Sequence, residues 1–188
     1  MLAGSDAAND DAPKAVGLSV YDFVRGEPSA FGSTPAQAME NFALAQNGSD
    51  YDGNRQYSST KAFSAWWSAA MARRHPGAVR FYTVSPGANL GTNASQHATG
   101  GFKLMLGFMR RFGTVFGMNQ PTEKGARRYI DVLHGNNGPY RIGGTYTSPP
   151  KKQVGPLVLS APPHLTDTDR QDTALAVLDK LTQQDSEA

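Results

Sequence analysis

The sequence reads Tyr57-Ser58-Ser59-Thr60-Lys61-Ala62 and, a helix length later, Val79-Arg80-Phe81-Tyr82-Thr83-Val84-Ser85-Pro86-Gly87. The first stretch opens an alanine-rich helix that we expect over Tyr57–Arg74, closed by His75-Pro76-Gly77. The second stretch is mostly β-branched and aromatic, which predicts a buried strand running into a loop at Ser85-Pro86-Gly87. A helix that leads into a buried strand is typical of α/β folds.

Further elements lie on both sides of this pair. The apolar start at Met1-Leu2-Ala3 predicts the end of a buried strand, and Tyr140–Thr147 predicts a last strand. Residues 148–168 are rich in proline, which predicts extended loop. Helices are expected over Thr34–Asn47, over Phe102–Phe116, from Pro121 to Gly135 with its apolar face at Ala126, Tyr129, Ile130 and Leu133, and in a short terminal segment around Ala174, Val177, Leu178 and Leu181.

Composition narrows the class of protein. A chain of 188 residues with 39% apolar residues is long enough for one domain with a core. No apolar run approaches the roughly 20 residues of a membrane span, and a net charge of +2 gives no argument for nucleic acid. The absence of cysteine excludes disulfides and thiolate sites and fits a cytoplasmic setting. The four histidines lie far apart without ligand spacing, so no metal site is predicted.

Tyr57 and Lys61 carry the chemistry that the sequence suggests. At i and i+4 they share one face of the expected helix, one turn apart. An ammonium at about 5 Å from the phenol would favour the phenolate by about 3 kcal/mol at an effective dielectric near 20. Such a phenol can give or take a proton near neutral pH. The pattern by itself is common, and a solvated helix face is the other interpretation.

In this order, Tyr57–Ala62, Val79–Gly87 and then Thr92 resemble the active-site helix, the sixth strand and the nicotinamide-side loop of the short-chain dehydrogenase/reductase family. The Gly125-Ala126 pair and the late strand near Tyr146 are also similar to the family's C-terminal half. The resemblance covers roughly residues 1–8 and 55–150. It implies the C-terminal half of a Rossmann-like doubly wound parallel sheet, with about three strands and flanking helices.

The resemblance also implies roles for particular residues. Tyr57 would be the proton donor or acceptor at the substrate oxygen, and Lys61 would support it and hydrogen-bond the ribose of NAD or NADP. Ser5, which follows the first strand, would hold the substrate oxygen, or it is an ordinary serine that caps a turn. Pro86 and Gly87 would shape the loop along the nicotinamide. Thr92 would contact the carboxamide, with Asn93 as the neighbouring candidate.

Two departures from the family's pattern affect these expectations. Ser5 lies far ahead of Tyr57, and an inserted segment over 6–54 with a short helix accounts for the distance, as in the retinol-dehydrogenase-like branch, which is also lengthened here. No G-x-G-x-x-G or G-x-x-x-G-x-G pattern occurs in the chain. The interpretation is a single partial domain: an insertion, a catalytic part over 57–147 and a C-terminal extension over 148–188, with the N-terminal dinucleotide-binding half absent.

Several alternatives stay open at this point. The chain is expected to interconvert a carbonyl and an alcohol on a small, lipophilic molecule, but it could be a non-catalytic remnant or interaction module, or an epimerase or dehydratase of the extended branch. The apolar segment Phe102–Phe116 is either a substrate lid or a core helix. Trp66 and Trp67 either belong to a face of the Tyr57–Arg74 helix that forms a homo-oligomer or pack within the monomer. The basic pairs, Arg127-Arg128 among them, are interpreted as solvated surface or as contacts for a cofactor phosphate or acidic substrate.

Overall fold

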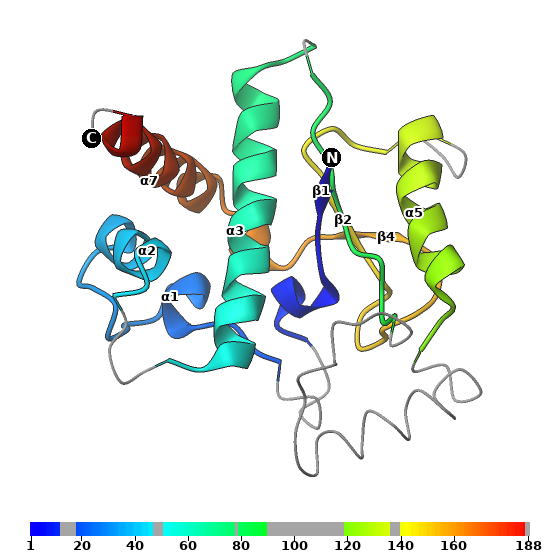
Figure 1. Cartoon of the computed structure of the whole chain (residues 1–188), viewed down its shortest axis with the longest axis horizontal. Helices are drawn as coiled ribbons and strands as arrows, with labels where there is room; N and C mark the ends of the chain where they lie inside the picture. Colours follow the sequence, from blue (N-terminus) through cyan, green and yellow to red (C-terminus); the bar gives the residue numbers. More distant parts are fainter. Residues whose placement is uncertain (12–17, 47–50, 78, 90–118, 136–139, 187–188) are drawn as a thin grey trace.

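The structure is a computed structural model that describes residues 1–11, 18–46, 51–77, 79–89, 119–135 and 140–186. A small sheet stands between the long helix α3 and helix α5, and more helices pack on the other side of α3 (Figure 1). The elements in chain order are β1 (Leu2–Ala3), the 3-10 helix η1 (Asp6–Asn9), α1 (Asp22–Arg25), α2 (Pro35–Ala43), α3 (Gly53–Arg74), β2 (Thr83–Val84), α5 (Thr122–His134), β3 (Thr145–Thr147), β4 (Val158–Ser160), α6 (Pro163–Thr166) and α7 (Thr168–Ser186). The chain is therefore mixed α/β, as the sequence predicts.

The sheet is mostly parallel. Its strand order is β1-β2-β3-β4, with β1, β2 and β3 parallel to one another and β4 antiparallel to β3. Leu2 pairs with Thr83, and Thr83 pairs with Thr145. The three parallel strands therefore end at one common edge of the sheet, which is where ligands gather in open α/β sheets.

The strands are shorter than the sequence suggests. The expected strands Val79–Val84 and Tyr140–Thr147 become Thr83–Val84 and Thr145–Thr147. In the second case a turn precedes the strand, because the Gly144 amide donates to the Arg141 carbonyl at 2.9 Å. The burial of the first strand is confirmed, since Val84 is completely buried.

The first strand lies at the edge of the sheet, so the prediction that Met1-Leu2-Ala3 is buried is wrong. Met1 is 42% exposed, and Ala3 is exposed as well. The Leu2 and Gly4 amides donate to carbonyls of the β2 segment, each at 2.8 Å. Successive residues of a strand direct their backbone groups to opposite sides, so the amide and carbonyl of Ala3 face the open edge.

The C-terminal part has more structure than the expected loop and short helix. Val158-Leu159-Ser160 forms β4 and extends the sheet. Helix α7 has 19 residues and packs against α3 and α2. The segment is therefore integrated into both the sheet and the helical core.

Local capping signals place the helices. Thr34 accepts a hydrogen bond from the Gln37 amide at 3.2 Å, so α2 begins where the sequence predicts. Helix α3 starts four residues before Tyr57, because the Asp52 carboxylate accepts from the amides of Asn54 and Arg55. Tyr57 and Lys61 consequently lie in the first turns of a helix that is already capped.

Most of the buried apolar residues belong to one core between the helices. It joins α1, α2, α3, α6 and α7 around stacked and edge-on aromatic rings, among them Tyr21, Phe23, Phe42 and Phe63. Trp66 is completely buried there and donates from Nε1 to the His164 carbonyl at 2.7 Å. Trp66 therefore packs within the monomer.

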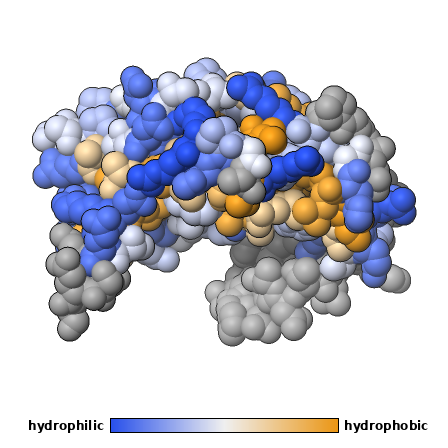
Figure 2. All heavy atoms as spheres, turned by 90° about the horizontal axis from the view of Figure 1, so that it is seen from above, coloured by the Kyte–Doolittle hydropathy of each residue, from blue (hydrophilic) through white to orange (hydrophobic). Residues whose placement is uncertain are grey.

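Helix α5 directs only part of its predicted face toward the sheet: Tyr129 packs against the core there, whereas Ala126 is exposed. Ile130 and Leu133, expected inside, are 50% and 61% exposed. The buried positions are Gly125, Arg128 and Val132, and a side chain at Gly125 would collide with the loop after β2. Apolar atoms accordingly gather on the side of the molecule where α5 lies, at the right of the face in Figure 2.

None of the helices in the described part of the chain is both long enough and apolar enough to cross a membrane.

Candidate active site

Those expected site residues that lie in the described part of the chain come from segments at the carboxyl edge of the parallel strands. Ser5 follows β1, and Pro86 with Gly87 follows β2. Helix α3 begins at this edge and runs back along the sheet, so Tyr57 and Lys61 lie at the same end (Figure 1). Chain topology therefore brings together residues from three separate segments.

Lys61 links two of these segments, α3 and the end of β1. Its Nζ donates a hydrogen bond to the Ala3 carbonyl at 2.9 Å, across the gap from α3 to β1. The same ammonium lies 5.7 Å from the centroid of the Tyr57 ring. Tyr57 is 47% exposed to solvent. A cation, a phenol and the end of a strand are thus within one cluster.

Ser5 has a demonstrated structural role. Its Oγ accepts a hydrogen bond from the Ala7 amide at 3.2 Å and caps η1, so the turn-capping interpretation is confirmed. Among the described residues no hydrogen bond joins Ser5 to Tyr57, so the structure brings them to the same edge without pairing them.

The loop after β2 is held by its own hydrogen bonds. Ser85 Oγ accepts from the Gly87 amide at 3.0 Å, and Gly87 has φ +72, a conformation that favours glycine. The Pro86 carbonyl accepts from Gln120 Nε2 at 2.6 Å. This loop presents a fixed backbone beside the strand ends. Thr92 and Asn93 lie outside the described residues, as does Phe102–Phe116.

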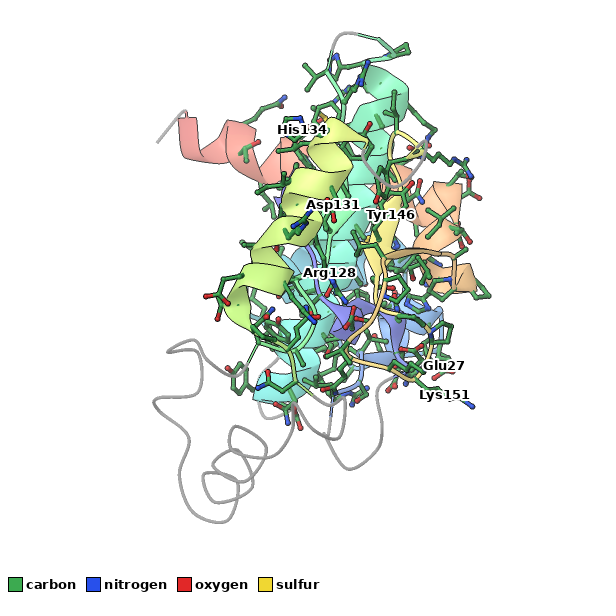
Figure 3. The ribbon with its side chains drawn as sticks, turned by 90° about the vertical axis from the view of Figure 1, so that its right-hand side faces the viewer. Glu27, Arg128, Asp131, His134, Tyr146 and Lys151 are labelled. Carbon is green, nitrogen blue, oxygen red and sulfur yellow. The ribbon has the colours of Figure 1, made fainter. Side chains whose placement is uncertain are left out.

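Arg128 is buried and hydrogen-bonds the start of this loop at Ser85, so the interpretation of Arg128 as solvated surface is wrong. It is 5% exposed, and its guanidinium donates to the Ser85 carbonyl at 3.1 Å, to Ser148 Oγ at 3.1 Å and to the Gly155 carbonyl at 2.7 Å. Figure 3 shows Arg128 on α5, with Asp131 and His134 farther along the same helix and Tyr146 on the neighbouring strand. Arg128 ties the ends of β2 and β3 to the loop near Gly155.

Tyr129 is a residue of the site region that the sequence interprets only as core. Burial raises the pKa of Tyr129, and the neighbouring Tyr57 phenol raises it further. The two tyrosines come from α3 and α5, 72 positions apart in the chain. No local spacing could reveal this proximity, because it depends on how the two helices flank the sheet.

In the described part of the chain, no three His, Asp or Glu side chains gather in a way that could hold a metal ion. No protein-family model matches the sequence, and no curated protein matches it. The geometry of the residues is therefore the basis on which function is argued.

Proposed function

We propose that this protein is an NAD(P)-dependent oxidoreductase of the short-chain dehydrogenase/reductase type, which interconverts a carbonyl and an alcohol on a small lipophilic molecule. The observation that carries the proposal is the position of Lys61, bonded to the end of β1 at 2.9 Å and 5.7 Å from the centre of the Tyr57 ring. A tyrosine beside an ammonium at the carboxyl edge of a parallel sheet is suited to proton transfer at a substrate oxygen.

The fold supports this proposal. Three parallel strands in the order β1-β2-β3, with α3 and α5 beside them, are compatible with the C-terminal half of a Rossmann-like sheet. In such sheets the crevice at the carboxyl ends of the strands receives the ligand. A cysteine-free chain also suits a reducing cytoplasm, which is where we place the protein.

In this proposal each side chain has one task. The Tyr57 hydroxyl protonates the carbonyl oxygen during reduction and takes the proton back during oxidation. The Lys61 ammonium stabilises the phenolate that is left after the proton has moved. The Ser5 hydroxyl donates a hydrogen bond to the same substrate oxygen and thereby orients the substrate. The backbone of Pro86 and Gly87 limits the space beside the reacting carbon.

The residues fit the reactive end of a nicotinamide cofactor. The Lys61 ammonium is hydrogen-bonded at the end of β1, the Tyr57 phenol is exposed, and the Pro86 carbonyl is held by Gln120. When bound, the cofactor would supply the hydride, and Lys61 would hydrogen-bond its ribose. For the pyrophosphate the sequence offers no glycine-rich turn, so the proposal names no residue there.

Turnover of NADPH or NADH with lipophilic aldehydes and ketones, followed at the nicotinamide absorbance, tests this proposal. Tyr57→Phe should lower the rate by at least about 100-fold, the usual contribution of a positioned acid–base group. Tyr51→Phe is the matched control, because Tyr51 is 66% exposed and lies six residues earlier. Absence of turnover by the folded chain, or equal rates for both variants, would contradict the proposal.

An interaction module is the second candidate, favoured by the open edge of β1. The amide and carbonyl of Ala3 face that edge, and the Ala3 carbonyl accepts a hydrogen bond from Lys61. Lysine is one of the residues by which proteins protect exposed sheet edges from pairing with other chains. In this second candidate Lys61 protects an edge that a partner strand would otherwise take.

Lys61→Ala separates the two candidates. An enzyme loses turnover and cofactor binding, whereas an edge-capped interaction module gains self-association, measured by sedimentation velocity. Lys180→Ala is the control, because Lys180 pairs with Glu40 at 2.7 Å on the distant α7 and α2 surface. Greater self-association without any cofactor effect would replace the first proposal by the second.

A further inference from the structure

Arg128 is a buried cation without a carboxylate partner in the described part of the chain. Its three acceptors are two carbonyl oxygens and one hydroxyl. The negative charge that acts on it is that of Asp6, whose carboxylate accepts from the Ser148 amide at 2.9 Å and acts on Arg128 through space rather than by a direct ion pair. A buried charge of this kind is costly unless an opposite charge neutralises it. Burial lowers the pKa of Arg128, against the opposing effect of the Asp6 charge.

A cavity of about 470 Å³ lies against this residue. Arg128, Lys124 and Arg127 contribute three cations to its lining, and Asp131 contributes the one carboxylate. The charge around the cavity is therefore +2, from three positive groups and one negative group. Arg127 and Asp131 are 3.9 Å apart, so their ion pair is loose, and the Arg127 side chain is 79% exposed. A small anion could reach these cations from solvent.

The rest of the cavity lining is mixed, with polar groups at Gln120 and Gly155 and apolar side chains at Tyr140, Pro156 and Leu157. Tyr140 and Leu157 line it, and Tyr140 packs edge-on against Tyr146 at 4.9 Å between ring centroids. A volume of this size is within the range of small-molecule sites. The combination of cations on one side and an aromatic wall on the other suits a ligand with an anionic group and an apolar body.

We propose that this cavity binds a small organic anion, a phosphate or carboxylate carried on an apolar ring. Arg127 and Lys124 bind the anionic group at the mouth, and Arg128 supplies positive charge from the floor. Tyr140 and Leu157 contact the apolar body. The cavity lining includes none of Ser5, Tyr57 and Lys61, so this site does not rest on the proposed oxidoreductase activity.

Isothermal titration calorimetry of the full chain with phenyl phosphate, benzoate, inorganic phosphate and benzyl alcohol tests this site. Phenyl phosphate and benzoate should bind saturably, inorganic phosphate more weakly and neutral benzyl alcohol the weakest. Arg127→Ala and Lys124→Ala should each weaken phenyl phosphate binding about tenfold, the loss expected for one charge-assisted hydrogen bond. Both residues are exposed, so circular dichroism should show unchanged folding.

Three further variants show whether binding occurs at this cavity. Asp131→Asn removes the carboxylate of the lining and should tighten phenyl phosphate binding about threefold, which a damaged fold could not do. Lys152→Ala removes an exposed lysine of the neighbouring loop and should change binding less than twofold. Tyr57→Phe should leave binding unchanged, which separates this site from the proposed catalytic one. Lack of saturable binding to the folded chain, equal weakening in Lys152→Ala, or equal affinity for benzyl alcohol would overturn the proposal.

Discussion

The helical side and the sheet side of the molecule are built very differently. The helical core contains sixteen buried residues, including six aromatic rings, and it joins five helices. The core beside the sheet has four buried residues, Tyr82, Val84, Val132 and Tyr146. Yet the strands of this sheet have only two or three residues each. The residues of the two candidate sites that lie at the sheet are Ser5, Pro86, Gly87 and Arg128. The comparison indicates that the helices supply stability and that the sheet, held by polar contacts, supplies the candidate sites.

The largest effect is expected in the helical core. Trp66→Ala removes a completely buried indole and its hydrogen bond to the His164 carbonyl. We expect a loss of about 4 kcal/mol in the free energy of unfolding, as for other buried aromatic residues replaced by alanine. Urea denaturation followed by circular dichroism measures it. A loss below about 1 kcal/mol would show that this core is not the main source of stability.

The polar contacts of the sheet side predict the next effect. Gly87→Ala adds a methyl group 2.6 Å from an Arg128 Nη atom at φ +72, and we expect a loss of about 3 kcal/mol from strain and overpacking. Gly77→Ala is the matched control, since Gly77 has φ +83 with no described atom within 4 Å of the added carbon. Strain alone should cost about 1 kcal/mol there. Equal losses in the same denaturation experiment would mean that the Arg128 contacts do not constrain the loop.

A pair of valines compares the two cores directly. Val24 and Val84 are both completely buried. Val24 belongs to the helical core, and Val84, a residue of β2, belongs to the smaller core at the sheet. Replacement by alanine removes the same two methyl groups, so the difference reflects the surroundings. We expect a loss of about 2 kcal/mol for Val24→Ala and about 1 kcal/mol for Val84→Ala, because the more densely packed site leaves the larger unfilled cavity. A larger loss at Val84 would reverse the comparison.

The smallest effect is a dependence on pH at the junction of the two regions. Burial lowers the pKa of His164, against the opposing effect of the Ala8 carbonyl at 2.7 Å from its Nε2. The unfolded chain then binds the proton more readily, so the free energy of unfolding should fall as the pH drops below about 6.5 toward the lower folded pKa. Denaturation between pH 7.5 and 5 should show this slope in the native chain and a flatter one in His164→Gln. The same slope in both would contradict it, and exposed His75→Gln is the control.

Local signals in the sequence predict the helices well. Thr34 caps α2 and Gly135 ends α5 with φ +65, both as their positions in the sequence predict. Such signals work because a cap involves only neighbours within one turn. Tyr57 and Lys61 belong to the same class, since their contact depends on helical spacing alone.

What the sequence does not show depends on distant contacts. Val158–Ser160 is flanked by prolines and becomes a strand only because β3 pairs with it. Arg128 is buried because three oxygen atoms from distant segments receive its donors, and it thereby changes which face of α5 points inward. A basic residue in a polar helix gives no local sign of this. The support that Arg128 gives to the loop after β2, and the proposed anion cavity, could therefore be found only in the folded chain.

The most direct test of the central claim is a titration of the folded chain with NADPH and NADH, followed by the fluorescence of Trp66 and Trp67. We expect saturable quenching that is lost in Lys61→Ala and kept in Lys180→Ala. The contrary result is a folded chain that shows no saturable quenching, or one in which Lys61→Ala binds as tightly as the native protein. Either would mean that the cluster of Tyr57, Lys61 and the end of β1 does not serve a nicotinamide cofactor.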